Sequence, residues 1–275
     1  MAEPAKRVRV RDLQEKKERG ERIAMLTVYD ATMARLLDRA GIDAVLVGDS
    51  LGMVIEGHDS TLPVTLDAVL HHTQAVARGA HRALVIADMP FLTYQLTTTE
   101  AVHNAGLLLQ RGGAAAVKLE GGHAVVEVVA RLVDAGIPVM GHLGLLPQHV
   151  HQLSGYRMQA RTEQEADQLV KDAQALEEAG AFSLVLESIP AEVARTVTRS
   201  LKIPTIGIGA GPFCDGQILV SYDAFGLNDE FVPPFVKQYA KLAELMVEAA
   251  RTYAQEVRCG RFPVLGPHTD DTFSR

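Results

Sequence analysis

Acidic side chains follow several short apolar runs of this sequence, each at the point where the run ends. Asp49 follows the run 44–48, Asp88 follows 83–87, and Glu187 follows 184–186. A further run, 115–121, contains Lys118 and Glu120 near its end. Short apolar runs without polar alternation are typical of parallel strands that are buried on both faces. In a barrel of such strands, side chains from several strands converge at the C-terminal strand ends. The pattern therefore predicts an active site that is assembled strand by strand.

Three of these acids, Asp49, Asp88 and Glu120, are expected to meet at the mouth of the barrel. Carboxylates gathered without a basic excess repel one another unless a cation lies among them. Ligation by oxygen atoms alone suits Mg²⁺, so the sequence predicts a magnesium site. The alternative is that the acids are helix N-caps or salt-bridge partners. This alternative is less favoured because several strand ends carry an acid.

A lysine and a histidine belong to the same set of strands. Lys118 and Glu120 are two residues apart, so their side chains point to the same face of a strand. Lys118 could form a Schiff base or act as a fixed cation for a carboxylate or carbonyl oxygen, and we favour the fixed cation because Glu120 keeps the amine protonated. His142 lies between Gly141 and Leu143, in a glycine-flanked segment that leaves room for a ligand. A buried histidine satisfied by the backbone is the alternative.

The elements that position these residues alternate between strand and helix. Strands are expected to begin at Ile23, Asp43, Ala83, Ala115, Pro138, Ser183, Pro204 and Gln217. Helical spacing is found in 66–78, 100–111, 125–135, 163–179 and 191–200. Eight alternations favour a (β/α)8 TIM barrel of class α/β over an open sheet. The charged stretch 11–19 is expected to form a helix that closes the barrel floor, and 234–257 an amphipathic helix.

Two connections on the expected catalytic face are long, 51–65 and 145–162, and long loops there are usually lids or binding loops. A glycine run, 207–211, ends the seventh strand, where barrels often hold a phosphate, although alone it indicates only a close approach of backbone or ligand. It does not follow the first strand of a dinucleotide-binding unit, which argues against a Rossmann fold.

Composition limits the domain organisation and the partners. The 275 residues are 47% hydrophobic and contain no linker-like segment, so we expect one domain over 1–275 with a flexible tail at 258–275. The net charge of -7, without a cluster of Lys or Arg, argues against nucleic acid and favours small-molecule partners. No apolar run approaches the ~18 residues of a membrane span. No targeting segment or disulfide framework is evident, so a cytoplasmic location is expected.

Several motifs of the chain, in order, resemble those of the ketopantoate hydroxymethyltransferase family over about 9–226. They are Leu26-Thr27-Val28-Tyr29-Asp30, Val47-Gly48-Asp49-Ser50-Leu51-Gly52, Gly57-His58-Asp59-Ser60-Thr61-Leu62-Pro63-Val64-Thr65, Ala87-Asp88-Met89-Pro90-Phe91, Val117-Lys118-Leu119-Glu120-Gly121-Gly122, Gly141-His142-Leu143-Gly144-Leu145, and the glycine run followed by Asp215-Gly216-Gln217-Ile218-Leu219-Val220. The motifs are long and individually unusual, so the resemblance is specific.

The resemblance implies a (β/α)8 barrel that transfers a hydroxymethyl group from 5,10-methylenetetrahydrofolate to 3-methyl-2-oxobutanoate, giving 2-dehydropantoate for pantothenate biosynthesis. It also implies Mg²⁺ as cofactor and a homodecamer. Carried over by position, Asp49, Asp88 and Glu120 form the metal sphere. Asp49, Ser50, Asp88, Lys118 and His142 contact the oxo acid, and Glu187 is the general base.

Two other functions compete with this interpretation. Magnesium-dependent lyases and mutases related to isocitrate lyase share such acids, but they usually carry a cysteine in a Lys-Cys-Gly-His segment, and here Met140 precedes Gly141 and His142. A barrel without activity that serves as a scaffold would be expected to lack one of the charged groups. All of them are present in the sequence.

Overall fold

The computed structural model describes residues 6–229 and 231–264, and its centre is a closed barrel of eight parallel strands in the order β1 to β8. The strands are β1 (Ile23–Thr27), β2 (Ala44–Val47), β3 (Leu84–Asp88), β4 (Ala116–Glu120), β5 (Val139–Gly144), β6 (Ser183–Glu187), β7 (Thr205–Ile208) and β8 (Gly216–Leu219). Each strand begins within one residue of its predicted start. The predicted (β/α)8 barrel is confirmed.

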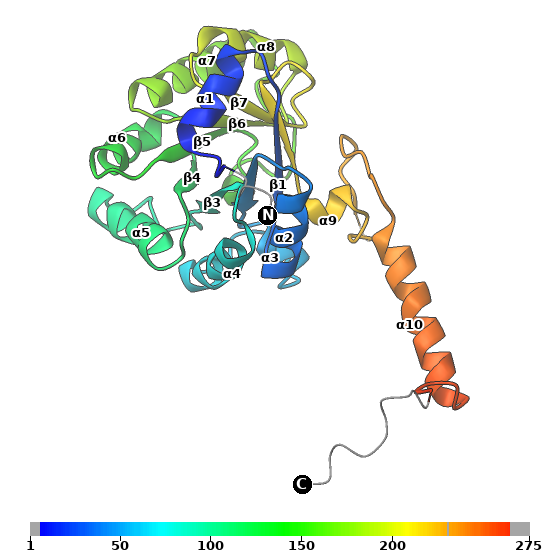
Figure 1. Ribbon diagram of the computed structural model, residues 1–275. Coiled ribbons are helices and arrows are strands. Elements are labelled where there is room, and N and C mark those ends of the chain that lie inside the picture. Colours follow the sequence, from blue (N-terminus) through cyan, green and yellow to red (C-terminus); the bar gives the residue numbers. More distant parts are fainter. Residues whose placement is uncertain (1–5, 230, 265–275) are drawn as a thin grey trace. The chain divides into compact units, whose positions relative to one another are not determined.

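Helices surround the barrel and connect its strands, as Figure 1 shows. They are α2 (Ala31–Arg39), α3 (Leu51–Val54), α4 (Leu66–Gly79), α5 (Thr98–Gln110), α6 (Val126–Asp134), α7 (Glu163–Glu178) and α8 (Ala191–Ser200). Four of them begin where a side-chain oxygen accepts a hydrogen bond from a free helix N–H. These caps are Asp30, Thr65, Thr97 and Thr162.

The first helix, α1 (Val10–Glu18), closes the floor of the barrel as predicted. Leu13 of this helix is fully buried in one cluster with Ile23, Ile206 and other residues that point into the barrel. Lys16 Nζ lies 3.2 Å from Asp43 Oδ1, and Lys17 Nζ lies 3.0 Å from Asp215 Oδ2. Apolar burial and these ion pairs hold α1 against the strand starts, so the opposite end is left for a ligand.

The chain divides into two compact units, Met1–Ser221 with the barrel and Tyr222–Arg275. The second unit contains α10 (Leu242–Arg258) after the short α9 (Ser221–Ala224) that spans the boundary. The prediction of a helix from 234 onward was wrong by eight residues. The segment forms a turn in which Val236 N donates to Pro233 O, and Tyr239 N donates to Ala224 O instead of to a preceding turn of helix.

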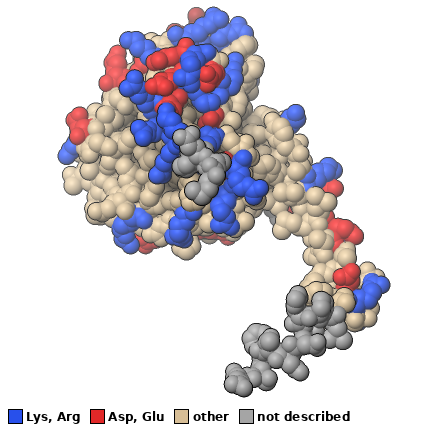
Figure 2. Space-filling model, in the orientation of Figure 1, with Lys and Arg blue, Asp and Glu red and all other residues tan. Residues whose placement is uncertain are grey.

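The predicted tail 258–275 is described only as far as residue 264, and the remainder lies outside the described residues. A single domain over 1–275 stays a prediction. In the described ranges, no helix is both long and apolar enough to span a bilayer. On the face drawn in Figure 2, acidic and basic side chains lie interspersed around α1.

Truncation of Leu13 tests whether α1 is part of the barrel core. We expect Leu13→Ala to lower the free energy of unfolding by about 2–5 kcal/mol, because it leaves a cavity under the strand starts. Leu36→Ala is the matched control, since Leu36 of α2 is 52% exposed. Its effect should stay within about 0.5 kcal/mol in urea unfolding. Equal losses for the two variants would contradict the assignment of α1 to the core.

Candidate active site at the barrel mouth

Strand alternation sends three charged side chains into the barrel. Ala116 of β4 and Met140 of β5 belong to the interior core cluster. Lys118 and Glu120 are two and four residues beyond Ala116, and His142 is two beyond Met140, so all three share the inward face. The strand register pairs Lys118 with Asp88 and Glu120 with His142. The four residues are buried side by side at the C-terminal strand ends.

Asp49 joins this group from the segment after β2. Its carboxylate is buried, and its main-chain N–H donates to Asp88 Oδ2 over 3.2 Å. The acids that the sequence placed together, Asp49, Asp88 and Glu120, therefore do lie at one mouth and not on separate surfaces.

The Lys118 ammonium lies between two of the carboxylates. Nζ is 2.9 Å from Asp88 Oδ1 and 3.6 Å from Glu120 Oε1. Burial alone would lower the pKa of this amine, but the charges of Asp88, Glu120 and Asp49 outweigh it and raise the pKa. Lys118 is thus held protonated, which a fixed cation needs and a Schiff-base nucleophile does not.

His142 bridges two acids from different strands. Its Nδ1 lies 3.4 Å from Glu120 Oε1, and its Nε2 lies 3.2 Å from Glu187 Oε2. Burial and Lys118, whose Nζ is 3.2 Å from Nδ1, both lower the pKa of the imidazole. The interaction with the two carboxylates outweighs both effects, and the pKa of His142 rises to about 9. The Glu187 side chain is 16% exposed, so it reaches the open side of the mouth.

Ser50, the predicted contact of the oxo acid, lies beside Asp49 at the start of α3. Its Oγ is 2.9 Å from the hydroxyl of Tyr29. The Tyr29 hydroxyl also donates to Thr27 Oγ1 over 2.8 Å. This hydroxyl chain runs from the end of β1 to the acids and fixes the orientation of the serine.

Two buried residues of the mouth were not identified from the sequence. The amide of Gln148 donates from Nε2 to Asp49 Oδ2 over 2.9 Å, and its Oε1 accepts from the hydroxyl of Tyr94 over 2.8 Å. Gln148 lies in the short helix η2 (Pro147–His149), inside the long connection 145–162 that the sequence placed on the catalytic face. Loop length was the only signal for Gln148, because loop residues have no periodic pattern.

Burial makes the negative charge of the mouth costly. The pKa of Asp49 is well above its usual range because the group is desolvated and because Asp88 and Glu120 repel it. Desolvation also raises the pKa of Asp88. For Glu120, desolvation is outweighed by the charge of Lys118 and by the nearby imidazole of His142, which lower the pKa. The site therefore lacks positive charge where Asp49 lies.

The mouth meets the electrostatic requirements of a divalent cation. Four carboxylates gather there against the cations Lys118 and His142. Asp88 Oδ1 and Glu120 Oε1 are buried and accept no hydrogen bond of good geometry from the residues that the structure describes. Among those same residues, no three His, Cys, Asp or Glu side chains already surround a common point for a metal. Donor type and charge fit Mg²⁺, and Lys118 occupies part of the space between the acids.

The glycine run after β7 packs against protein atoms. A Cβ on Gly207 would lie 3.0 Å from Cys214 Sγ, and one on Gly211 would lie 2.5 Å from Cβ of Ala191. Gly211 also has a φ of +74°, in the left-handed region that favours glycine. The close approach that the sequence predicted is thus made by neighbouring side chains.

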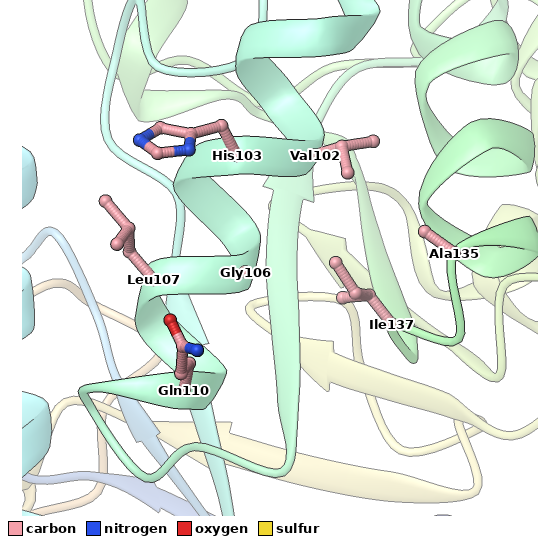
Figure 3. A pocket seen from close by; sticks show the side chains of 7 residues that line it. All are labelled: Val102, His103, Gly106, Leu107, Gln110, Ala135 and Ile137. Atoms are coloured by element: carbon pink, nitrogen blue, oxygen red, sulfur yellow. The ribbon is translucent and has the colours of Figure 1, made fainter.

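A separate hollow lies on the outside of the barrel (Figure 3). It is formed by α5 and the connection from α6 to β5, and its lining residues are Val102, His103, Gly106, Leu107, Gln110, Ala135 and Ile137. None of the predicted site residues lies there, so the hollow is not part of the candidate active site.

Comparison with known proteins agrees with the constellation at the mouth. The model of the ketopantoate hydroxymethyltransferase family matches residues 7–264. The chain belongs to this family. The 3-methyl-2-oxobutanoate hydroxymethyltransferase of Moorella thermoacetica is 59% identical over 257 residues, which cover 94% of this chain and 96% of that one. The enzyme of the same name from Chloroflexus aurantiacus is 55% identical, with 94% and 91% covered.

Solved structures with low sequence identity share the barrel. Phosphonopyruvate hydrolase in complex with oxalate and Mg²⁺ superimposes with a TM-score of 0.61 at 16% identity, over 92% of this chain and 88% of that one. A 2,3-dimethylmalate lyase of the PEP mutase/isocitrate lyase superfamily gives 0.61 at 19% identity, over 95% and 89%. At such identities the likeness supports the fold alone.

Removal of one buried charge tests the electrostatics of the mouth. We expect Asp49→Asn to raise the thermal unfolding midpoint of the metal-free protein at pH 7.5 by a few degrees, since ~1 kcal/mol corresponds to roughly 2–4 °C in a chain of this size. An acid whose pKa is raised by folding destabilises the protein as the pH rises from about 4 through the folded pKa. The gain should therefore shrink as the pH falls.

Asp43→Asn is the matched control, because Asp43 is also buried but is paired with Lys16 on the barrel floor. We expect the thermal unfolding midpoint of Asp43→Asn to fall. A lower midpoint for Asp49→Asn in the presence of chelator would contradict the excess of negative charge at the mouth.

Proposed function

We propose that the protein transfers a hydroxymethyl group from 5,10-methylenetetrahydrofolate to 3-methyl-2-oxobutanoate and forms 2-dehydropantoate. The observation that carries the proposal is the mouth itself, where Asp49, Asp88 and Glu120 gather around the protonated Lys118 and Glu187 lies beside His142. Membership in the ketopantoate hydroxymethyltransferase family supports it, as do relatives named 3-methyl-2-oxobutanoate hydroxymethyltransferase at 52–59% identity.

The first task of the site is to bind an α-oxo acid and orient it. Lys118 offers a fixed positive charge to the keto or carboxylate oxygen, and the Ser50 hydroxyl, held by Tyr29, offers a hydrogen bond. Asp49, Asp88 and Glu120 would hold Mg²⁺, which as a Lewis acid stabilises negative charge on the keto oxygen. The buried setting strengthens the interaction of Lys118 with that oxygen because little water screens it.

The second task is proton removal from C3 of the oxo acid. Glu187 takes this proton as general base, and its position 3.2 Å from His142 Nε2 fixes the direction of the carboxylate. The electron pair of the broken C3–H bond becomes the nucleophile and attacks the methylene carbon. A C3–C bond forms, both carbon–nitrogen bonds of the methylene group break, and water supplies the hydroxyl group. The proton taken from C3 and one proton of the water go to the two nitrogens of the carrier. The products are 2-dehydropantoate and tetrahydrofolate.

Four further expectations come with this function. The cofactor is Mg²⁺, and methylenetetrahydrofolate is a co-substrate. The oligomer is a homodecamer, and the location is cytoplasmic. All of these stay predictions. The experiment below distinguishes the proposed enzyme from a scaffold without activity.

Exchange of the C3 proton of 3-methyl-2-oxobutanoate in D₂O tests the proposed base without the folate substrate. We expect Mg²⁺-dependent exchange with the wild-type protein, followed by NMR, and a loss of about 100-fold or more in Glu187→Gln. Glu192→Gln is the matched control, because Glu192 begins α8 on the surface and pairs only with Arg195 in the described ion pairs. No exchange by the wild-type protein would favour the scaffold interpretation, and full exchange by Glu187→Gln would exclude Glu187 as the base.

A further inference from the structure

Gln148 connects groups from three different elements at the mouth. Its Nε2 donates to Asp49 Oδ2 over 2.9 Å and to the main-chain oxygen of Met89 over 3.0 Å. Its main-chain N–H donates to Glu120 Oε2 over 3.1 Å. The residue is 3% exposed, so these bonds form away from water and are costly to leave unmade.

The direction of the Gln148 amide is determined by its neighbours. Met89 O can only accept a hydrogen bond, so the NH₂ group must face it and, beside it, Asp49 Oδ2. The amide oxygen then faces Tyr94 and accepts from its hydroxyl over 2.8 Å. Tyr94 is itself buried, and its hydroxyl accepts from the main-chain N–H of Glu120 over 3.1 Å. A flipped amide would bring its oxygen against Met89 O, acceptor against acceptor.

The strand ladder cannot orient Asp49 by itself. Asp49 lies two residues beyond the end of β2, and Glu120 ends β4, with β3 between the two strands. No ladder bond joins β2 to β4, and the main-chain bond from Asp49 to Asp88 leaves the Asp49 carboxylate itself free to turn. Gln148 contacts the carboxylates of both Asp49 and Glu120.

The connection that carries Gln148 is fixed to β6 near both of its ends. Leu145 N donates to Glu187 O over 2.8 Å, and Gln159 N donates to Ser188 O over 2.9 Å. Ser188 has a φ of +47°, a strained value for a residue with a side chain, directly after the proposed base. The same connection therefore contacts the end of β6 and reaches across to Asp49 and Glu120.

We propose that Gln148 is a positioning residue that holds the carboxylates of Asp49 and Glu120 in the arrangement that binds the divalent cation. Its side chain orients Asp49, its main-chain N–H orients Glu120, and Tyr94 orients the Gln148 amide. The inference rests on the proposed function, because it concerns the cation that this function requires.

Calorimetric titration of the full chain with Mg²⁺, without oxo acid or folate, tests the inference. Gln148→Met keeps the length of the side chain and the main-chain bond to Glu120 but removes both amide hydrogens. We expect its affinity for Mg²⁺ to fall at least about 10-fold, as is usual when a partner of a metal ligand is lost. Gln159→Met is the matched control, since the Gln159 side chain donates to Arg157 O in the same connection. Its affinity should equal that of the wild-type protein.

Tyr94→Phe removes the hydroxyl that donates to Gln148 Oε1. This variant tests the inference if Gln148→Met does not fold. We expect a smaller loss of Mg²⁺ affinity in the same direction. Wild-type affinity in a folded Gln148→Met or Tyr94→Phe protein would overturn the positioning role and leave the proposed function intact. A wild-type protein that binds no Mg²⁺ would overturn the positioning role together with the magnesium step of the proposed function.

Discussion

Burial of like charges at the barrel mouth is the constraint on which the rest of the site depends. Asp49, Asp88 and Glu120 are nearly inaccessible to water, and two of them have raised pKa values because their charges are desolvated. A protein keeps such groups together only when other charges compensate them. Lys118 and His142 supply part of that compensation, and a divalent ion would supply the rest. The proposed ion would thus relieve the repulsion among the acids.

The barrel satisfies this constraint through rigid geometry. Strand register places Asp88 next to Lys118 and Glu120 next to His142, so each buried acid on a strand has a cation beside it. The floor is closed by α1 and contributes apolar packing, which offsets the cost of the charged end. Asp49 lies outside the ladder and depends on a loop residue, Gln148. The strands therefore position Asp88 and Glu120, and a loop residue contacts Asp49.

Much of this architecture could be predicted from the sequence because it follows from local patterns. Buried parallel strands are apolar runs, and the two-residue spacing of Lys118 and Glu120 determines that both face inward. Sequence patterns did not predict the features that depend on tertiary contacts. The start of α10 was misplaced because the segment before it bonds to the residues after α9, where Tyr239 N donates to Ala224 O. Gln148 and Tyr94 were missed because their roles exist only after distant segments pack together. The family resemblance implied the roles of Ser50 and Glu187, and the structure shows the contacts that orient them.

In the proposed function, the acids of the mouth bind a single divalent cation together with the α-oxo acid. Anomalous diffraction from crystals grown with Mn²⁺ and 3-methyl-2-oxobutanoate measures this most directly. We expect one anomalous peak within ligand distance of carboxylate oxygens of Asp49, Asp88 and Glu120, with oxo-acid density beside Lys118. A peak at another surface, or oxo acid bound at the mouth with no metal peak beside it, would contradict the claim.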